Sequence, residues 1–200
     1  MGDAELGIRS ISHATQANVS GLYRAEDEAL QKMSAGMSHT KLAEWNMHFN
    51  TDQYKLGEIA NQIRLWVKRD DVKIAFVDHI GLIEVPDAKN TVDRISTVTR
   101  AIKKLAKDLD IPIVIVSQLN RGNEKENRKP RLSDLRDSGS IEQDADMVLL
   151  MHEVRSDHGD YMRHELMMAK NRQGPTGLLN AVVTFDGQRQ TFREENNHEY

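Results

Sequence analysis

The run Val72-Lys-Ile-Ala-Phe-Val-Asp78 carries the strongest indication of a fold. It is short and mostly apolar and it closes on an acid, which is typical of a buried strand that delivers a carboxylate to its C-terminal edge. A second run, Ile111-Pro-Ile-Val-Ile-Val116, leads into the polar side chain of Gln118. Between them, apolar residues recur at helical spacing over 92–109. This order predicts a parallel βαβ unit with Asp78 and Gln118 at one edge, where ligands of open parallel sheets bind.

The rest of the chain is predicted to add helices before this unit and strands after it. Helical spacing covers 6–14, 25–33 and 56–67, with Gly21 and Gly36 as breakers between helices. Later elements are a short helix, a third buried strand and a hairpin around a turn rich in Gly and Pro; they cover 141–145, 147–151 and 165–185. We expect the polar last twelve or so residues to be frayed. Together these elements predict an α/β domain.

The composition is ordinary for a globular chain. Its 200 residues are 38% hydrophobic and 29% charged, which suits one domain or two small ones. No apolar stretch is long enough to span a bilayer, and the first residues lack the charged-then-apolar pattern of a signal peptide. The absence of cysteine excludes disulfides, thiolate metal sites and thiol catalysis, and the eight histidines are too irregularly spaced to favour a metal site. We therefore expect a cytoplasmic protein without a membrane partner.

The net charge of −4 hides a basic stretch over 120–136. A basic loop in a mildly acidic protein is suited to phosphate contact. A solvated loop would have the same composition, so charge alone leaves both interpretations open. The basic residues are Arg121, Lys125, Arg128, Lys129, Arg131 and Arg136, against Glu124, Glu126 and Asp134.

Asp78 and Gln118 have the chemistry expected beside a nucleotide. A strand-end carboxylate can hold Mg²⁺ through water, because a hard cation prefers oxygen ligands. A glutamine amide both donates and accepts hydrogen bonds, which suits the sensing of a phosphate or an attacking water. Strand-end aspartates also cap turns, and amides also bond within loops, so the two residues alone are a generic signal.

Three further motifs follow the acid-terminated strand. They are Ser117-Gln-Leu-Asn-Arg121, Asp134-Leu-Arg-Asp-Ser-Gly-Ser-Ile-Glu-Gln-Asp-Ala-Asp146 and Lys170-Asn-Arg-Gln-Gly-Pro-Thr-Gly177. In order and spacing they closely resemble the C-terminal motor domain of DnaB-type replicative helicases, from near residue 1 to about residue 193. The resemblance implies a RecA-like fold, a hexameric ring, and ATP-driven 5′-to-3′ translocation on single-stranded DNA with duplex unwinding at a replication fork.

The resemblance also implies catalytic roles. Asp78 matches the carboxylate that holds Mg²⁺ through water, and Gln118 matches the sensor between the γ-phosphate and the DNA loops. Lys170 and Arg172 match finger residues that reach the nucleotide of the next subunit. Because Asn171 separates these two cations, strand geometry would aim both to one side. The alternative for this pair is an ordinary surface hairpin.

A DNA-binding loop is implied at Arg136, Asp137 and Gly139, with Arg121 at the end of the preceding motif as a further DNA contact. Gly139 stands between two serines, and a residue without Cβ lets the backbone approach phosphates closely. Main-chain N–H donors would then bind DNA without sequence preference. A structural turn is the alternative interpretation of this loop.

The sequence departs from the family in one respect. It contains no G-x-x-x-x-G-K-[ST] phosphate-binding loop; Gly36-Met-Ser-His-Thr-Lys41 lacks the second glycine and has the wrong spacing. The resemblance implies ATP and Mg²⁺ as cofactors of the complete family motor. Because the phosphate-binding loop is missing, we expect these 200 residues alone not to hydrolyse ATP at a useful rate. The resemblance also implies that the sheet lacks its central P-loop strand, which leaves unpaired edges; we expect a marginal domain unless another chain supplies that strand.

The predicted organisation is a helical segment of the motor over 1–70, a RecA-like core over 71–193 and a disordered tail over 194–200. The core would be a mostly parallel sheet flanked by helices, with a C-terminal β-hairpin. The leading hypothesis is a portion of a helicase motor whose partners are single-stranded DNA, further copies of itself, and a primase and a helicase loader. The alternative is a catalytically dead DNA-binding or ring-interacting remnant. A recombinase is disfavoured by the motif ending at Asp146.

Overall fold

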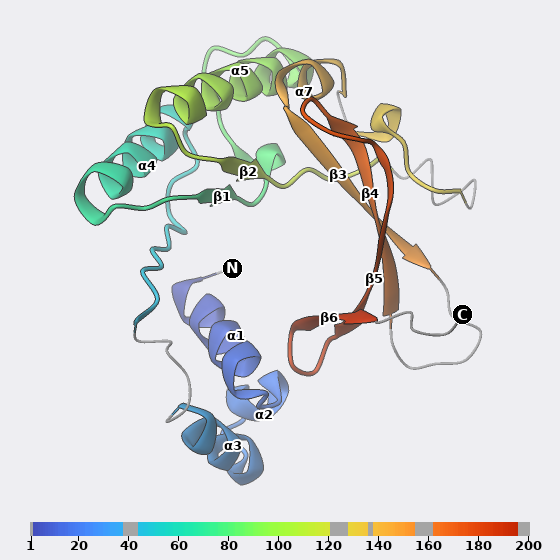
Figure 1. Ribbon diagram of the computed structural model, residues 1–200. Coiled ribbons are helices and arrows are strands. Elements are labelled where there is room, and N and C mark those ends of the chain that lie inside the picture. Colours follow the sequence, from blue (N-terminus) through green and yellow to red (C-terminus); the bar gives the residue numbers. More distant parts are fainter. Residues whose placement is uncertain (1, 38–43, 121–127, 136–137, 155–161, 196–200) are drawn as a thin grey trace. The chain divides into compact units, whose positions relative to one another are not determined.

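The computed structural model describes residues 2–37, 44–120, 128–135, 138–154 and 162–195 (Figure 1). Contacts divide the chain into two units. Unit 1 contains Met1–Thr51, Glu153–Leu166 and Leu179–Tyr200, and unit 2 contains Asp52–His152 and Met167–Leu178. None of the helices in the described ranges is both long and apolar enough to cross a membrane.

The βαβ unit predicted from the sequence lies in unit 2. Strands β1 (Ala75–Val77) and β2 (Ile113–Ile115) pair in parallel, with Phe76 opposite Val114. Helix α5 (Thr91–Leu109) connects them. It begins where the Asn90 side chain accepts a hydrogen bond from Asp93 N, and it ends at Asp110 in the left-handed conformation. Figure 1 shows α5 and α4 (Leu56–Asp70) on the same side of the strand pair.

The core of unit 2 lies between those two helices and one face of the pair. Its most buried members, Val98 and Leu105, come from the apolar stripe of α5. The remaining buried members are Ile63, Ala75, Ile80, Ile83, Ile95, Ile102 and Ile111. Burying this set supplies the main hydrophobic driving force for the unit.

The opposite face of the strand pair is exposed, which corrects the prediction of fully buried strands. Phe76 is 69% exposed, and Val114 and Val116 are also exposed. Within the described residues of this unit the helices cover only one face. An apolar run in a sequence indicates a strand but does not say whether both of its faces are covered.

The other strands form a second sheet, so the single mostly parallel sheet expected from the sequence is not seen in the described residues. The order of this sheet is β3-β4-β5-β6. The strands span Met147–Val154, Met162–Asn171, Gly177–Asp186 and Thr191–Glu195. The predicted third strand is therefore present as β3, but it pairs in this sheet and not beside β1 and β2.

A second apolar cluster in unit 2 joins β3 to the elements before it. Val148 and Leu150 alternate with exposed residues along β3 and pack with Leu135. Helix α7 (Ser138–Asp144) contributes Ile141, which packs against this cluster and against the core under β1 and β2. Through Ile141, α7 is fixed between the two apolar clusters.

In unit 1, three helices pack through the glycines expected to break them. The helices are α1 (Asp3–Thr15), α2 (Val19–Tyr23) and α3 (Asp27–Met37). Gly21 lies within α2 and Gly36 within α3, so the prediction of breakers is wrong. A Cβ on Gly36 would approach Thr15 Cβ to 2.7 Å, and one on Gly21 would approach Ala29 Cβ to 2.8 Å. The glycines therefore permit close helix packing, which outweighs their low helix propensity.

Strand β6 corrects the expectation of a frayed C-terminal segment, within the part that the structure describes. It pairs antiparallel with β5, and Phe192 lies opposite Phe185 with ring centroids 4.7 Å apart. The turn between the strands donates to the Asp186 side chain, with Arg189 Nη1 at 2.6 Å. Arg193 Nη2 also donates to Gln16 Oε1 at 2.9 Å. The polar side chains here bond to other residues of the chain, whereas composition alone predicts that they are solvated and the segment frayed.

Candidate functional site

Asp78 and Gln118 lie at the carboxyl edge of the parallel pair. Asp78 directly follows β1, and Gln118 comes three residues after β2. The strand ends are held together by hydrogen bonds from Val116 N to Val77 O at 2.9 Å and from Ile80 N to Val116 O at 3.0 Å. Both polar side chains are exposed. We call these two residues the carboxyl edge.

The carboxyl edge is open. Among the residues that the structure describes, neither Asp78 nor Gln118 has a side-chain hydrogen-bond partner, and no group of three or more His, Cys, Asp or Glu side chains could hold a metal ion. A lone exposed carboxylate fits Mg²⁺ that keeps most of its waters, since this ion dehydrates reluctantly. Asp78 therefore has the chemistry to hold Mg²⁺ through water.

Lys170 and Arg172 lie together at the end of β4, beside the last turn of α7. Lys170 Nζ donates to Glu142 O, and Arg172 Nη2 donates to Gln143 O at 2.6 Å. Both acceptors are main-chain carbonyls at the C-terminal end of a helix, where cations are stabilised. Both side chains reach the same helix end, in keeping with the alternation of residues along a strand.

Asp146 completes this cluster. Its Oδ1 accepts from Arg172 Nη1 at 3.1 Å, and its Oδ2 pairs with Lys103 Nζ of α5. The hydrogen bond from Lys103 is the main cause that holds the pKa of Asp146 below its ordinary value, with the charges of Lys103, Arg172 and Lys170 adding to it. We call the side chains of Lys103, Asp146, Lys170 and Arg172, with the carbonyl groups of Glu142 and Gln143, the cation seat.

The predicted DNA-binding loop is described only in part. Gly139 lies in the first turn of α7, is exposed, and has open space within 4 Å of where a Cβ would stand. Arg121, Arg136 and Asp137 lie outside the described residues. Among the described residues, no neighbour of Gly139 requires a glycine for packing, in contrast to Gly21 and Gly36.

The basic stretch over 120–136 contains a closed ion pair. Arg128 donates to both oxygens of Asp134, at 2.6 and 2.8 Å, and Arg131 N donates to the same carboxylate at 2.7 Å. These donors, Arg128 first, lower the pKa of Asp134 to about 2. Asp134 is buried, so Arg128 neutralises an internal charge and the stretch is less basic toward a ligand than its composition indicates.

The backbone around Asp134 holds the two ends of the basic stretch together. Asn120 N donates to Asp134 O at 2.7 Å, and Leu119 and Leu135 form an antiparallel bridge. Asp134 therefore stabilises the contact between the two described segments that flank 121–127, which lie outside the described residues.

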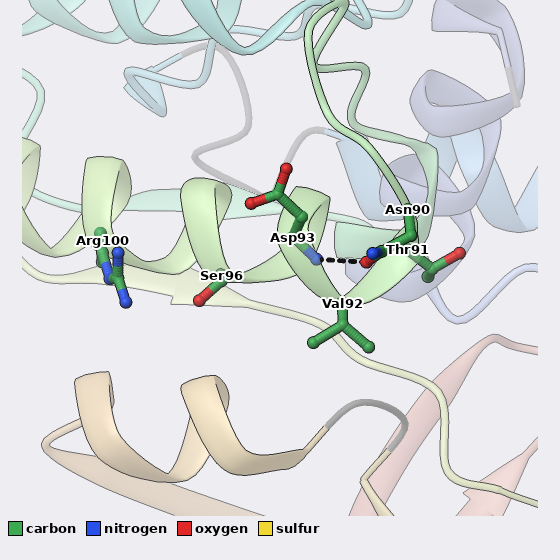
Figure 2. A pocket seen from close by; sticks show the side chains of 6 residues that line it. All are labelled: Asn90, Thr91, Val92, Asp93, Ser96 and Arg100. Atoms are coloured by element: carbon green, nitrogen blue, oxygen red, sulfur yellow. Dashed lines mark hydrogen bonds between the residues drawn. The ribbon is translucent and has the colours of Figure 1, made fainter.

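A hollow of about 570 Å³ at the start of α5 is a weaker candidate (Figure 2). It is lined by Asn90, Thr91, Val92, Asp93, Ser96 and Arg100. Helix N-termini attract anions, but Asp93 places a carboxylate there and also accepts from Lys89 N at 3.0 Å. The main-chain N–H of Asp93 already donates to the Asn90 side chain (Figure 2). This hollow is therefore a capped helix end with little capacity for a phosphate.

Sequence reasoning did not identify Asp146, Lys103 or Asp134 as members of these clusters. Asp134 and Asp146 begin and end the second of the three motifs. Asp146 also directly precedes the apolar run 147–151, and an acid beside an apolar run was the signal that led to Asp78. Lys103 had no such signal, because it is one of several cations on the wetter side of α5. Its partner is 43 residues away, so only the fold brings them together.

Comparison with known proteins identifies the family of the chain. A family model described as the DnaB-like helicase C terminal domain matches residues 1–194. The Probable plasmid replicative DNA helicase of Chlamydia trachomatis is 44% identical over 135 residues, which cover 67% of this chain and 29% of that protein. Replicative DNA helicase DnaB of Mycoplasma pneumoniae is 35% identical over 158 residues, covering 72% and 33%.

A solved structure has the same fold. It is described as a DnaB-like replicative helicase and its interactions with primase, and it superposes with a TM-score of 0.81 at 27% identity. The match covers 96% of this chain and 48% of that one. The α/β fold is thus that of a DnaB-like helicase domain. The chain belongs to the DnaB-like helicase C-terminal domain family and spans about a third of the length of the curated relatives it matches.

Proposed function

We propose that these residues form part of a replicative DNA helicase motor, which couples ATP hydrolysis to 5′-to-3′ translocation on single-stranded DNA and to duplex unwinding. The observation that carries the proposal is the family match over residues 1–194. The carboxyl edge and the cation seat support it, because each offers a group that phosphoryl transfer requires.

At the carboxyl edge, Asp78 would hold Mg²⁺ through water and Gln118 would sense the γ-phosphate. When bound, the ion would neutralise charge on the phosphate oxygens. The openness of both side chains supports these roles, since a carboxylate already bound to a cation of its own chain would be a poorer ligand. The amide of Gln118 is equally able to donate to a phosphate oxygen and to accept from a water.

The cation seat would act on the nucleotide of the neighbouring subunit. Two cations pair with Asp146 there and Lys170 donates to the nearby Glu142 carbonyl, so the side chains of the seat carry more positive than negative charge. Arg172 is 48% exposed and can meet an anion from outside the chain. A guanidinium delivered in trans stabilises charge on the transferring phosphoryl group and raises the rate about 10³- to 10⁵-fold.

DNA would bind at the start of α7, through Arg136, Asp137 and Gly139, with Arg121 as a further contact. The open space at Gly139 supports close approach of a phosphate to the main chain. The assembled motor would be a hexameric ring in the cytoplasm, with a primase and a helicase loader as further partners.

A complementation assay tests this proposal. A DnaB-like helicase with an intact P-loop, in which the two residues matching Lys170 and Arg172 are alanine, is mixed with the 200-residue chain. Hydrolysis of ATP is measured with and without single-stranded DNA. We expect DNA-stimulated hydrolysis to rise when the chain is added, because the chain enters the ring and supplies the missing cations.

The chain alone is the control, and we expect no turnover from it. Absence of complementation by a folded chain that does enter the ring would contradict the proposed role of the cation seat. Co-sedimentation of the two proteins decides whether the chain enters the ring. A chain that enters the ring without restoring hydrolysis favours the catalytically dead, ring-interacting interpretation.

A further inference from the structure

Asp146 contacts cations from two different elements. Its Oδ1 accepts from Arg172 at the end of β4, and its Oδ2 pairs with Lys103 from α5. The main chain repeats the contact, because Arg172 N donates to Asp146 O at 3.0 Å. Arg172 is thus bound to Asp146 through both its backbone and its side chain.

These contacts leave much of the Arg172 guanidinium available. A guanidinium has five N–H donors, and the bonds to Asp146 and Gln143 use one on each Nη, so about three remain. The side chain is 48% exposed. Arg172 is therefore fixed on one side and open on the other.

The Arg128–Asp134 pair shows what a purely structural pair looks like in the same unit. There the carboxylate is only 10% exposed, and both of its oxygens are taken by a single guanidinium. Asp146 instead is 55% exposed and divides its oxygens between two cations. Exposed pairs add little to stability, so the arrangement at Asp146 calls for another explanation.

We propose that Asp146 is a positioning residue for Arg172: with the Gln143 carbonyl of α7 it holds the guanidinium toward a phosphate that arrives from outside the chain, beside Lys170 on the Glu142 carbonyl. This inference rests on the proposed function, which gives the two cations that phosphate. It goes further in assigning the orientation of the Arg172 side chain to Asp146, and the orientation of Asp146 to Lys103.

The surroundings make the seat rigid. Thr99 Oγ1 of α5 donates to Asp144 Oδ2 of α7 at 2.6 Å, and Ile141 packs in both apolar clusters of the unit. The carbonyls that accept from Lys170 and Arg172 therefore belong to a helix fixed at two points. A catalytic group held by a rigid support loses less freedom when it meets the substrate.

NMR of the full 200-residue chain tests the positioning directly, without nucleotide. Restricted rotation keeps the Nη proton signals of a held guanidinium apart. We expect resolved Arg172 signals in the unsubstituted chain, averaged signals in Asp146→Asn, and resolved signals again in Asp146→Glu. Asp71→Asn is the matched control, since it removes an exposed carboxylate that pairs with Lys73 at 2.5 Å on the same unit.

The complementation assay gives the second measurement. Asp146→Asn is expected to lower kcat about 10- to 100-fold with little change in KM, because misplacement of a catalytic group acts in the transition state. Asp146→Glu is expected to recover most of that loss.

The two measurements separate failure of this inference from failure of the proposed function. Arg172 signals that remain resolved in a folded Asp146→Asn chain would overturn the inference, whatever the activity. Signals that are resolved in the unsubstituted chain and averaged in Asp146→Asn support positioning, whether or not the chain complements. If the unsubstituted chain then gives no complementation, only the proposed function fails. Equal kcat for Asp146→Asn and the unsubstituted chain would also overturn it.

Discussion

The carboxyl edge and the cation seat differ in how far the chain itself organises them. Asp78 and Gln118 have no side-chain partner among the described residues, whereas each cation of the seat has a named acceptor. The edge thus depends on a ligand for its final geometry, and the seat has that geometry in advance. This difference suits a motor in which the edge handles nucleotide with groups outside these residues and the seat presents cations to another subunit.

The largest loss of stability is expected from a substitution in the apolar core of unit 2. Leu105 is 1% exposed and packs in α5 beneath the parallel strands, while Lys103 of the same helix binds Asp146. Leu105→Ala should lower the free energy of unfolding by about 2–5 kcal/mol through lost burial and a cavity. Urea unfolding followed by circular dichroism measures it.

Phe76→Ala is the matched control, because Phe76 is 69% exposed and its loss should change stability little. A large effect of Phe76→Ala would show that the exposed face of the parallel pair is covered in solution, and the carboxyl edge would then be less open than described.

A smaller effect is expected for DNA binding at the start of α7. Gly139→Ala meets no neighbour within 4 Å, so the fold should tolerate it. If phosphates approach the main chain there, the added methyl group should weaken oligo-deoxythymidine binding about tenfold, or ~1.4 kcal/mol. Fluorescence anisotropy measures the affinity. Gly57→Ala in α4, which also has open space, should have no effect.

The pH dependence of stability distinguishes the closed Arg128–Asp134 pair from the open seat. The pKa of Asp134 lies at about 2 in the folded chain, below its ordinary 3.8. A lowered folded-state pKa contributes stability that is present above the ordinary pKa and is lost as the pH falls from about 4 towards 2. Asp134→Asn should lose stability at neutral pH and show a weaker decline in this acid range.

Urea unfolding at several pH values would show it. A decline of unchanged steepness in Asp134→Asn would mean that the remaining carboxylates, Asp146 and Asp186 among them, account for the acid sensitivity. The pKa of each of these two is also lowered in the folded chain.

Much of the fold could be predicted from periodicity. Apolar spacing indicated α1, α3, α4 and α5 to within a few residues, and the apolar runs indicated β1, β2 and β3. It did not indicate which faces are covered, since exposed Phe76 and buried Ala75 belong to the same apolar run. Nor did it indicate β6, because the contacts around that strand are polar: Arg189 donates to Asp186 in the turn, and Arg193 donates to Gln16, which is distant in the sequence.

For the candidate site, the sequence led to residues but not to their contacts. The motifs led to Lys170 and Arg172, yet Asp146 contacts Arg172 and Lys103 only because the fold brings the start of β3, α5 and the end of β4 together. The charge count of the basic stretch could not show that Arg128 pairs with a buried carboxylate. Composition records charges, but their availability depends on partners that the fold supplies.

The most direct test of the account compares two variants of the chain in the complementation assay. Asp78→Ala should complement as well as the unsubstituted chain, because a seat that acts as proposed on the nucleotide of the neighbouring subunit would need nothing from the carboxyl edge of its own chain. The double variant Lys170→Ala/Arg172→Ala should lose the stimulation by about 10³-fold or more. Full complementation by the double variant, or its loss in a folded Asp78→Ala chain, would contradict the account.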